Sequence, residues 1–155
     1  MTSEAAASRI KTWLAQDKLS FEEKSLEGDR FRFAIKDQRL NTEVFQPTAL
    51  EDSVFIVCVI VFRSSDFQPM EASKRESLAW SIRLGLAQMG VEFEGVQMPL
   101  ERVVVTNRIW YDGLSKDTFF SRWLEVRRSS LWLIWKVNEA LGQEPQFPTT
   151  GGPVN

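Results

Sequence analysis

The chain of 155 residues contains no histidine and only one cysteine, Cys58. Histidine is the side chain that most often serves as a general base near neutral pH and as a ligand for transition metals, so both chemistries lack their usual residue. Cys58 lies within the apolar run Val54–Phe62, where a thiol nucleophile would have neither a base nor exposure to solvent. We therefore interpret Cys58 as a small buried hydrophobic residue, and we expect no enzymatic activity, no catalytic residue, no metal and no cofactor.

Long apolar segments are also missing. The longest uninterrupted run, Val54–Phe62, is far shorter than the roughly 20 residues that a membrane-spanning helix needs. The first residues carry Glu4 and no apolar stretch of the kind found in a secretory signal. A single cysteine forms no internal disulfide, which is typical of a reducing compartment. We expect a cytoplasmic protein without membrane insertion.

The charge balance is close to neutral, with 19 basic and 21 acidic residues and a net charge of −2. This balance provides no long-range attraction for a phosphate backbone. The basic residues near the C-terminal end of the chain alternate with Glu125 and Glu139, and neither glycine-rich phosphate-binding motif occurs. Acidic pairs such as Glu92 and Glu94 have a spacing found in most proteins, and we interpret them as solvated. We expect no nucleic-acid partner.

The apolar periodicity predicts an α+β domain over residues 1–142, built on an antiparallel sheet. The order of elements is α-β-β-β-β-α-β-β-α. Helices are expected over residues 3–18, 69–89 and 115–141, and strands over residues 20–27, 30–36, 41–46, 53–63, 91–98 and 102–111. Residues 143–155 are rich in proline and glycine and show no periodicity, which predicts a flexible tail.

Two of the predicted strands have informative patterns. Residues 30–36 place Phe31 and Phe33 on one side and Arg32 on the other, which predicts a sheet with one wet face at this position. Residues 53–63 are apolar on both sides, which predicts a central strand that is covered on both faces. One cover would be the helices of the domain, and the other would be a further element or a second subunit.

The last predicted helix is about 40 Å long at 1.5 Å per residue, so it crosses a domain of this size. Its apolar stripe is wider than one sheet face requires. The chain also contains six tryptophans and eleven phenylalanines against one tyrosine, and tryptophan is enriched at protein interfaces. We interpret most of these aromatics as core residues. The candidate partner or dimer interface comprises Trp80, Leu131, Trp132 and Trp135.

The densest polar and aromatic segment ends the last predicted strand and enters a turn before the long helix. Such a cluster at a strand end can recognise a ligand. Its residues define a candidate ligand cleft that comprises Asn107, Arg108, Trp110, Tyr111 and Asp112. The alternative is a capped strand end in which Asp112 and Gly113 are ordinary turn residues.

The order of elements resembles the type III secretion chaperone-like fold over residues 3–141. The stretch WYDGLSKDTFFSRWLEVRRSSLWLIW, residues 110–135, is most similar to a group of small uncharacterised proteins of that fold, of cyanobacterial type. The resemblance implies a homodimer that binds an extended segment of another protein and needs no cofactor.

Three hypotheses about function follow from these patterns. The first is a non-enzymatic, homodimeric protein-binding module of chaperone-like type, whose partners are a second copy of itself and an unidentified protein. The second is a small-molecule-binding protein or enzyme with a cleft near residues 107–112. The third is a structural subunit of a larger assembly.

Overall fold

The computed structural model describes residues 1–37 and 39–143. The helices are α1 (Ser3–Gln16), α2 (Ala72–Gln88) and α3 (Lys116–Leu141). The strands are β1 (Phe21–Lys24), β2 (Asp29–Ile35), β3 (Thr42–Pro47), β4 (Ser53–Val61), β5 (Glu92–Glu94) and β6 (Arg102–Trp110), with 3₁₀ turns at Ser64–Phe67 and Tyr111–Gly113. The predicted α+β class and element order are confirmed. The predicted flexible tail lies outside the described residues, apart from Gln143.

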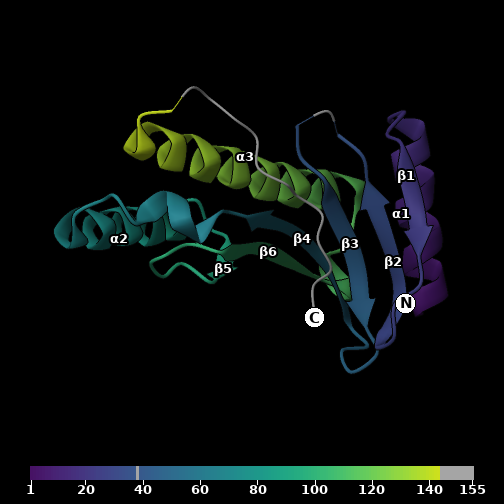
Figure 1. The fold of residues 1–155 in the computed structure, drawn as a ribbon. Coiled ribbons are helices and arrows are strands. Elements are labelled where there is room, and N and C mark those ends of the chain that lie inside the picture. Colours follow the sequence, from purple (N-terminus) through teal and green to yellow (C-terminus); the bar gives the residue numbers. More distant parts are fainter. Residues whose placement is uncertain (38, 144–155) are drawn as a thin grey trace.

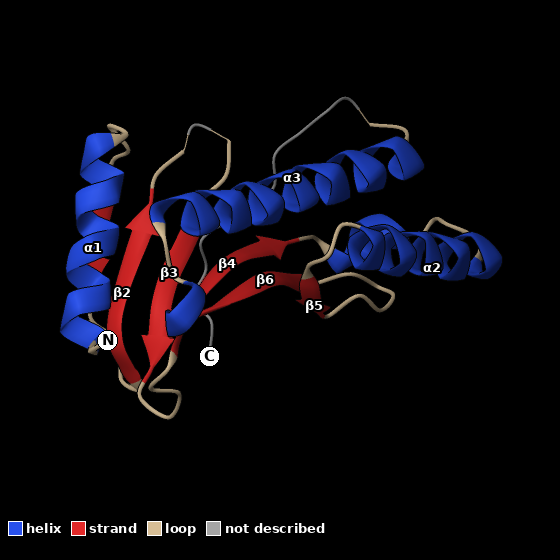
Figure 2. Ribbon diagram, turned by 180° about the vertical axis from the view of Figure 1, so that it is seen from behind, coloured by secondary structure: helices blue, strands red, loops and turns tan. Residues whose placement is uncertain are grey.

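The strands form one antiparallel sheet in the order β1-β2-β3-β4-β6-β5. All three helices contribute to a single core against one face of this sheet (Figure 1, Figure 2). Ile10 of α1, Ile82 of α2 and Leu133 of α3 are fully buried there, together with Ile56 of β4. Apolar burial of this kind is the main stabilising contribution to the fold.

Strand β4 lies at the centre of the sheet, between β3 and β6. Its residues Ile56 and Ile60 face the helices, whereas Val57 and Val59 face away from them. Val57 and Val59 are only 1% and 2% exposed. The prediction that this strand is buried on both faces is therefore confirmed.

The expectation of a wet face at Arg32 is wrong. Arg32 is 3% exposed. Its guanidinium donates a hydrogen bond of 2.6 Å to Asp29 and pairs with Glu43, whose side chain is also buried. The buried charge is tolerated because oppositely charged groups surround it, which is the condition for burying an arginine.

Strand β5 is shorter than the sequence predicts, because it ends at Gly95. This residue has φ 84°, in the left-handed region that favours glycine. A Cβ atom at Gly95 would lie 2.0 Å from the carbonyl oxygen of Arg102. The close approach of β6 therefore requires glycine here.

Both ends of α3 agree to within one residue with the predicted range 115–141. Ser115 is the N-cap, and its hydroxyl accepts a hydrogen bond of 3.1 Å from the backbone N–H of Thr118. Gly142 ends the helix with φ 65°, the left-handed conformation typical of this position. The caps fix the length of the helix that carries most of the candidate interface.

Candidate functional site

Helix α3 packs across β4 and β6, and its C-terminal part lies beside α2 near one end of the sheet (Figure 1, Figure 2). The aromatic ring of Trp132 on α3 packs directly over Gly85 of α2. A Cβ atom at Gly85 would lie 2.1 Å from the tip of that ring, so only glycine allows this contact. Trp132 is consequently half-buried and holds the two helices together.

The solvent side of this helix pair exposes large apolar side chains. Trp80 is 55% exposed and Trp135 is 48% exposed, so the structure leaves both on the surface. Leu84, one turn after Trp80 on α2, is also exposed. We define the α2–α3 aromatic surface as Trp80, Leu84, Trp132 and Trp135.

Leu131 does not belong to this surface. It is 7% exposed and lies in the main core, so its side chain cannot meet a partner in this fold. Leu84 was not among the predicted interface residues, although the sequence places it on the same side of its helix as Trp80. The one available signal is its i,i+4 spacing from Trp80, which places the two side chains on the same helix face.

Residues 107–112 divide between two sides of the sheet. Asn107 is buried on the helix side, where its amide donates a hydrogen bond of 2.8 Å to Glu125. Arg108 is on the opposite side and donates a hydrogen bond of 2.9 Å to Ser53. The alternation of side chains along a strand makes this division unavoidable. The five predicted cleft residues therefore do not line a common cavity.

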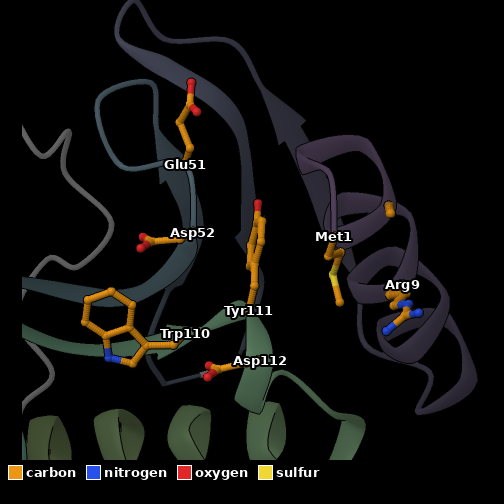
Figure 3. Close-up of a pocket in the computed structure, with 8 residues that line it drawn as sticks. Met1, Arg9, Glu51, Asp52, Trp110, Tyr111 and Asp112 are labelled. Carbon is orange, nitrogen blue, oxygen red and sulfur yellow. The ribbon is translucent and has the colours of Figure 1, made fainter.

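The remaining three, Trp110, Tyr111 and Asp112, do reach a shared hollow of about 780 Å³. Figure 3 shows Tyr111 between the β3–β4 turn and helix α1. The other lining residues are Met1, Ala5, Arg9, Glu51 and Asp52. Tyr111 donates a short hydrogen bond to the buried Gln46, which fixes its ring.

Two of the three carboxylates that line this hollow are held in ion pairs. Glu51 pairs with Arg30 at 2.6 Å, and Asp52 pairs with Arg108 at 3.4 Å. Arg9 and Asp112 are the other charged residues that line the hollow. The described residues include no group of three His, Cys, Asp or Glu side chains that could hold a metal ion.

The sheet face that points away from the helices carries a row of aromatic and basic side chains. Phe45 and Phe55 stack with ring centroids 5.6 Å apart. Arg32 lies 4.1 Å from the centroid of Phe45, and Arg108 lies 3.6 Å from that of Trp110. Such contacts are favourable because the ring face attracts a cation. The sequence did not reveal this row, since it requires the registers of β2, β3, β4 and β6.

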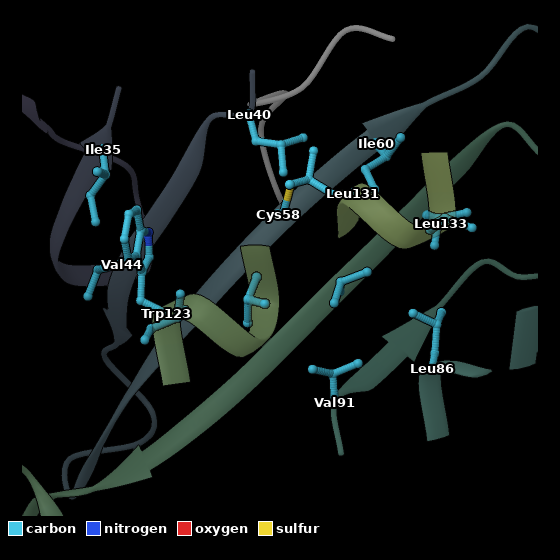
Figure 4. Close-up of a cluster of buried hydrophobic side chains, with 14 of the residues drawn as sticks. Ile35, Leu40, Val44, Cys58, Ile60, Leu86, Val91, Trp123, Leu131 and Leu133 are labelled. Atoms are coloured by element: carbon cyan, nitrogen blue, oxygen red, sulfur yellow. The ribbon is translucent and has the colours of Figure 1, made fainter. Parts of the chain in front are cut away.

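Cys58 is buried in the main core, with Leu40, Ile60 and Leu131 around it (Figure 4). Burial in apolar surroundings raises the pKa of its thiol to about 11. A hydrogen bond with Ser130 acts in the opposite direction and is the smaller effect. The residue thus has the properties of a structural cysteine.

We predict that native Cys58 is nearly inert to iodoacetamide at pH 8. Because its pKa is about 11, only about one thiol in a thousand is ionised at this pH. Burial reduces the rate further. Mass spectrometry should find alkylation at least about a hundredfold slower than in urea-unfolded chain. Comparable rates in the two states would contradict the buried placement.

These observations define the class of the protein. It is an α+β protein with a six-stranded antiparallel sheet, helices on one face and a helix pair with exposed aromatic side chains. The chain belongs to the family described as an uncharacterized conserved protein (DUF2299), whose model matches residues 6–137. No curated protein matches the chain. Among the residues described, no helix is both long and apolar enough to cross a membrane.

The chain also matches solved structures. The chain is similar to an uncharacterized protein from Methanothermobacter thermautotrophicus, with 27% sequence identity and a TM-score of 0.82, over 88% of this chain and 99% of that one. YbjN from E. coli matches over 87% of each chain with 14% identity, but its TM-score of 0.33 is too low to indicate a shared fold. These matches do not support the predicted resemblance to the type III secretion chaperone-like fold or to the cyanobacterial group.

Proposed function

We propose that this chain is a non-enzymatic, cytoplasmic protein-binding module that forms a homodimer through the α2–α3 aromatic surface. The observation that carries the proposal is the exposure of Trp80 and Trp135, about half of each residue, on two adjacent helices. Tryptophan is among the residue types that most often dominate binding energy at interfaces.

A second copy of the chain is the partner that we favour at this surface. Burying the exposed half of one large aromatic side chain contributes roughly 1 kcal/mol. In a two-fold dimer each contact occurs twice, so one set of residues contributes on both subunits. The net charge of −2 adds little repulsion between copies.

The resemblance to type III secretion chaperones extends this proposal to a second ligand, an extended segment of another protein. It rests on the order of the elements and on the excess of apolar helix surface. The dimer would then be the unit that binds the segment, as the resemblance implies, and no cofactor would take part.

We predict that Trp135→Glu raises the dimer dissociation constant by about tenfold or more, because it places a charge in an apolar contact. Sedimentation velocity over a dilution series measures this constant. Trp110→Glu is the matched control, since Trp110 is equally exposed, at 49%, but lies on β6. The control should leave the constant unchanged, and both variants should keep the far-ultraviolet dichroism of the native chain.

Native mass spectrometry of the unchanged protein tests directly whether the homodimer forms. A mass of two chains supports the dimer. A strictly monomeric mass at all concentrations would contradict it. A single chain that carries a small bound molecule would favour the second candidate function, ligand binding in the hollow at Tyr111, which its volume of about 780 Å³ allows.

A further inference from the structure

The hollow at Tyr111 is bordered by parts of the chain that are distant in the sequence. Helix α1, the turn between β3 and β4, and the end of β6 with the 3₁₀ turn that follows it each contribute one wall (Figure 3). Its volume of about 780 Å³ lies within the range of roughly 300–1,000 Å³ that is typical of small-molecule sites. The hollow is therefore large enough for a ligand, and its walls decide which chemistry it can recognise.

The aromatic wall of the hollow is held in place. The hydroxyl of Tyr111 donates a short hydrogen bond to Gln46, which is fully buried. The backbone N–H of Tyr111 donates a further hydrogen bond of 2.7 Å to the carbonyl oxygen of Asp52. Arg108 lies over the neighbouring ring of Trp110, at 3.6 Å from its centroid. Because both rings are fixed before a ligand arrives, little conformational entropy is lost when an apolar group packs on them.

Two charged side chains of the hollow are available to a ligand. The carboxylates of Glu51 and Asp52 already pair with arginines. Arg9 on α1 and Asp112 in the turn after β6 are exposed, and neither forms an ion pair with another residue that the structure describes. Figure 3 shows the two on opposite sides of Tyr111. The hollow thus offers a cation at one wall, a carboxylate at another, and an aromatic ring between them.

A dipolar ligand with an apolar body fits this arrangement. A guanidinium binds a carboxylate through two parallel hydrogen bonds, and a carboxylate binds an ammonium group. A free amino acid carries both charges on one carbon atom, so it cannot place them on opposite sides of a ring. We propose that the hollow binds a short peptide with free termini. Its terminal carboxylate pairs with Arg9, its terminal ammonium pairs with Asp112, and its apolar side chains pack on Tyr111. This inference rests on the second candidate function, ligand binding in the hollow, and is independent of the homodimer.

The test is a titration of the full, isotope-labelled chain with the dipeptide leucyl-phenylalanine, followed by NMR. We expect saturable shifts of the backbone amides at the start of α1 and in the turn after β6. Arg9→Gln and Asp112→Asn should each raise the dissociation constant by about threefold to fivefold, the range expected for an ion pair near solvent. Lys11→Gln and Asp117→Asn remove the same charges from α1 and from the start of α3, outside the hollow, and should leave the constant unchanged.

Blocked forms of the dipeptide assign its two ends. The C-terminal amide lacks the carboxylate, so Arg9→Gln should no longer weaken its binding, and the N-acetyl form should likewise be insensitive to Asp112→Asn. The absence of saturable shifts at millimolar dipeptide would overturn the peptide site. Binding in the hollow that neither variant weakens would overturn the dipolar recognition, while the second candidate function would stand. Sedimentation velocity on the same samples measures the dimer dissociation constant and so tests the homodimer separately.

Discussion

Replacing Arg32 by methionine should lower the free energy of unfolding by about 3–5 kcal/mol. The side chains of Arg32 and Glu43 are only 2% and 4% exposed, so removal of the guanidinium leaves Glu43 and Asp29 with excess negative charge away from water. Lys24, which pairs with Glu43 at 2.9 Å, compensates in part and places the expected cost toward the lower end of this range. Urea unfolding followed by circular dichroism measures the change.

Arg30→Met is the matched control for this prediction. Arg30 lies in the same strand and pairs with Glu51, but both side chains are exposed, at 36% and 75%. An exposed ion pair contributes less than about 1 kcal/mol, so this variant should be nearly neutral. The triple variant Asp29→Asn, Arg32→Met and Glu43→Gln should recover part of the loss, because no uncompensated charge remains in the buried site and the Lys24 side chain reaches solvent. Equal costs for Arg30→Met and Arg32→Met would contradict the buried ion cluster.

The order of the elements could be predicted because local patterns determine it. Alternation at Phe31 and Phe33, apolar residues on both sides of β4, and the caps Ser115 and Gly142 are all properties of short segments. Each pattern depends on a few neighbouring residues and on the periods of helix and strand. For the same reason the doubly buried strand could be recognised before its neighbours were known.

The features that escaped prediction depend on residues that are distant in the sequence. Arg32 is buried because the register of β2 and β3 brings Glu43 to its guanidinium. Trp132 and Trp135 are three residues apart on one helix, yet only Trp132 meets a glycine on α2. Periodicity assigns both to a helix surface and contains no information about Gly85. The candidate interface was therefore predicted as a group of aromatics, and the structure was needed to separate the exposed members from the packed ones.

Substitution of Gly85 tests directly the packing of α2 against Trp132 of α3. Alanine is favoured over glycine in a helix interior by about 1 kcal/mol, so Gly85→Ala would stabilise an isolated α2. In the folded protein the new Cβ atom would lie 2.1 Å from the Trp132 ring. Overpacking of this kind typically costs about 1–3 kcal/mol. We expect Gly85→Ala to destabilise the protein by up to about 2 kcal/mol net, measured by urea unfolding.

The sign of this effect should reverse when the ring is removed. In a Trp132→Leu background the space above Gly85 is open, and the same Gly85→Ala change should stabilise the protein by up to about 1 kcal/mol through helix propensity alone. Gly113→Ala is a suitable control, because a Cβ atom there would meet nothing within 4 Å. A double-mutant cycle gives the coupling between the two positions, which non-contacting residues would not show. Additive effects at 85 and 132 would mean that the ring does not rest on the glycine, and that Trp132 is held by something other than α2.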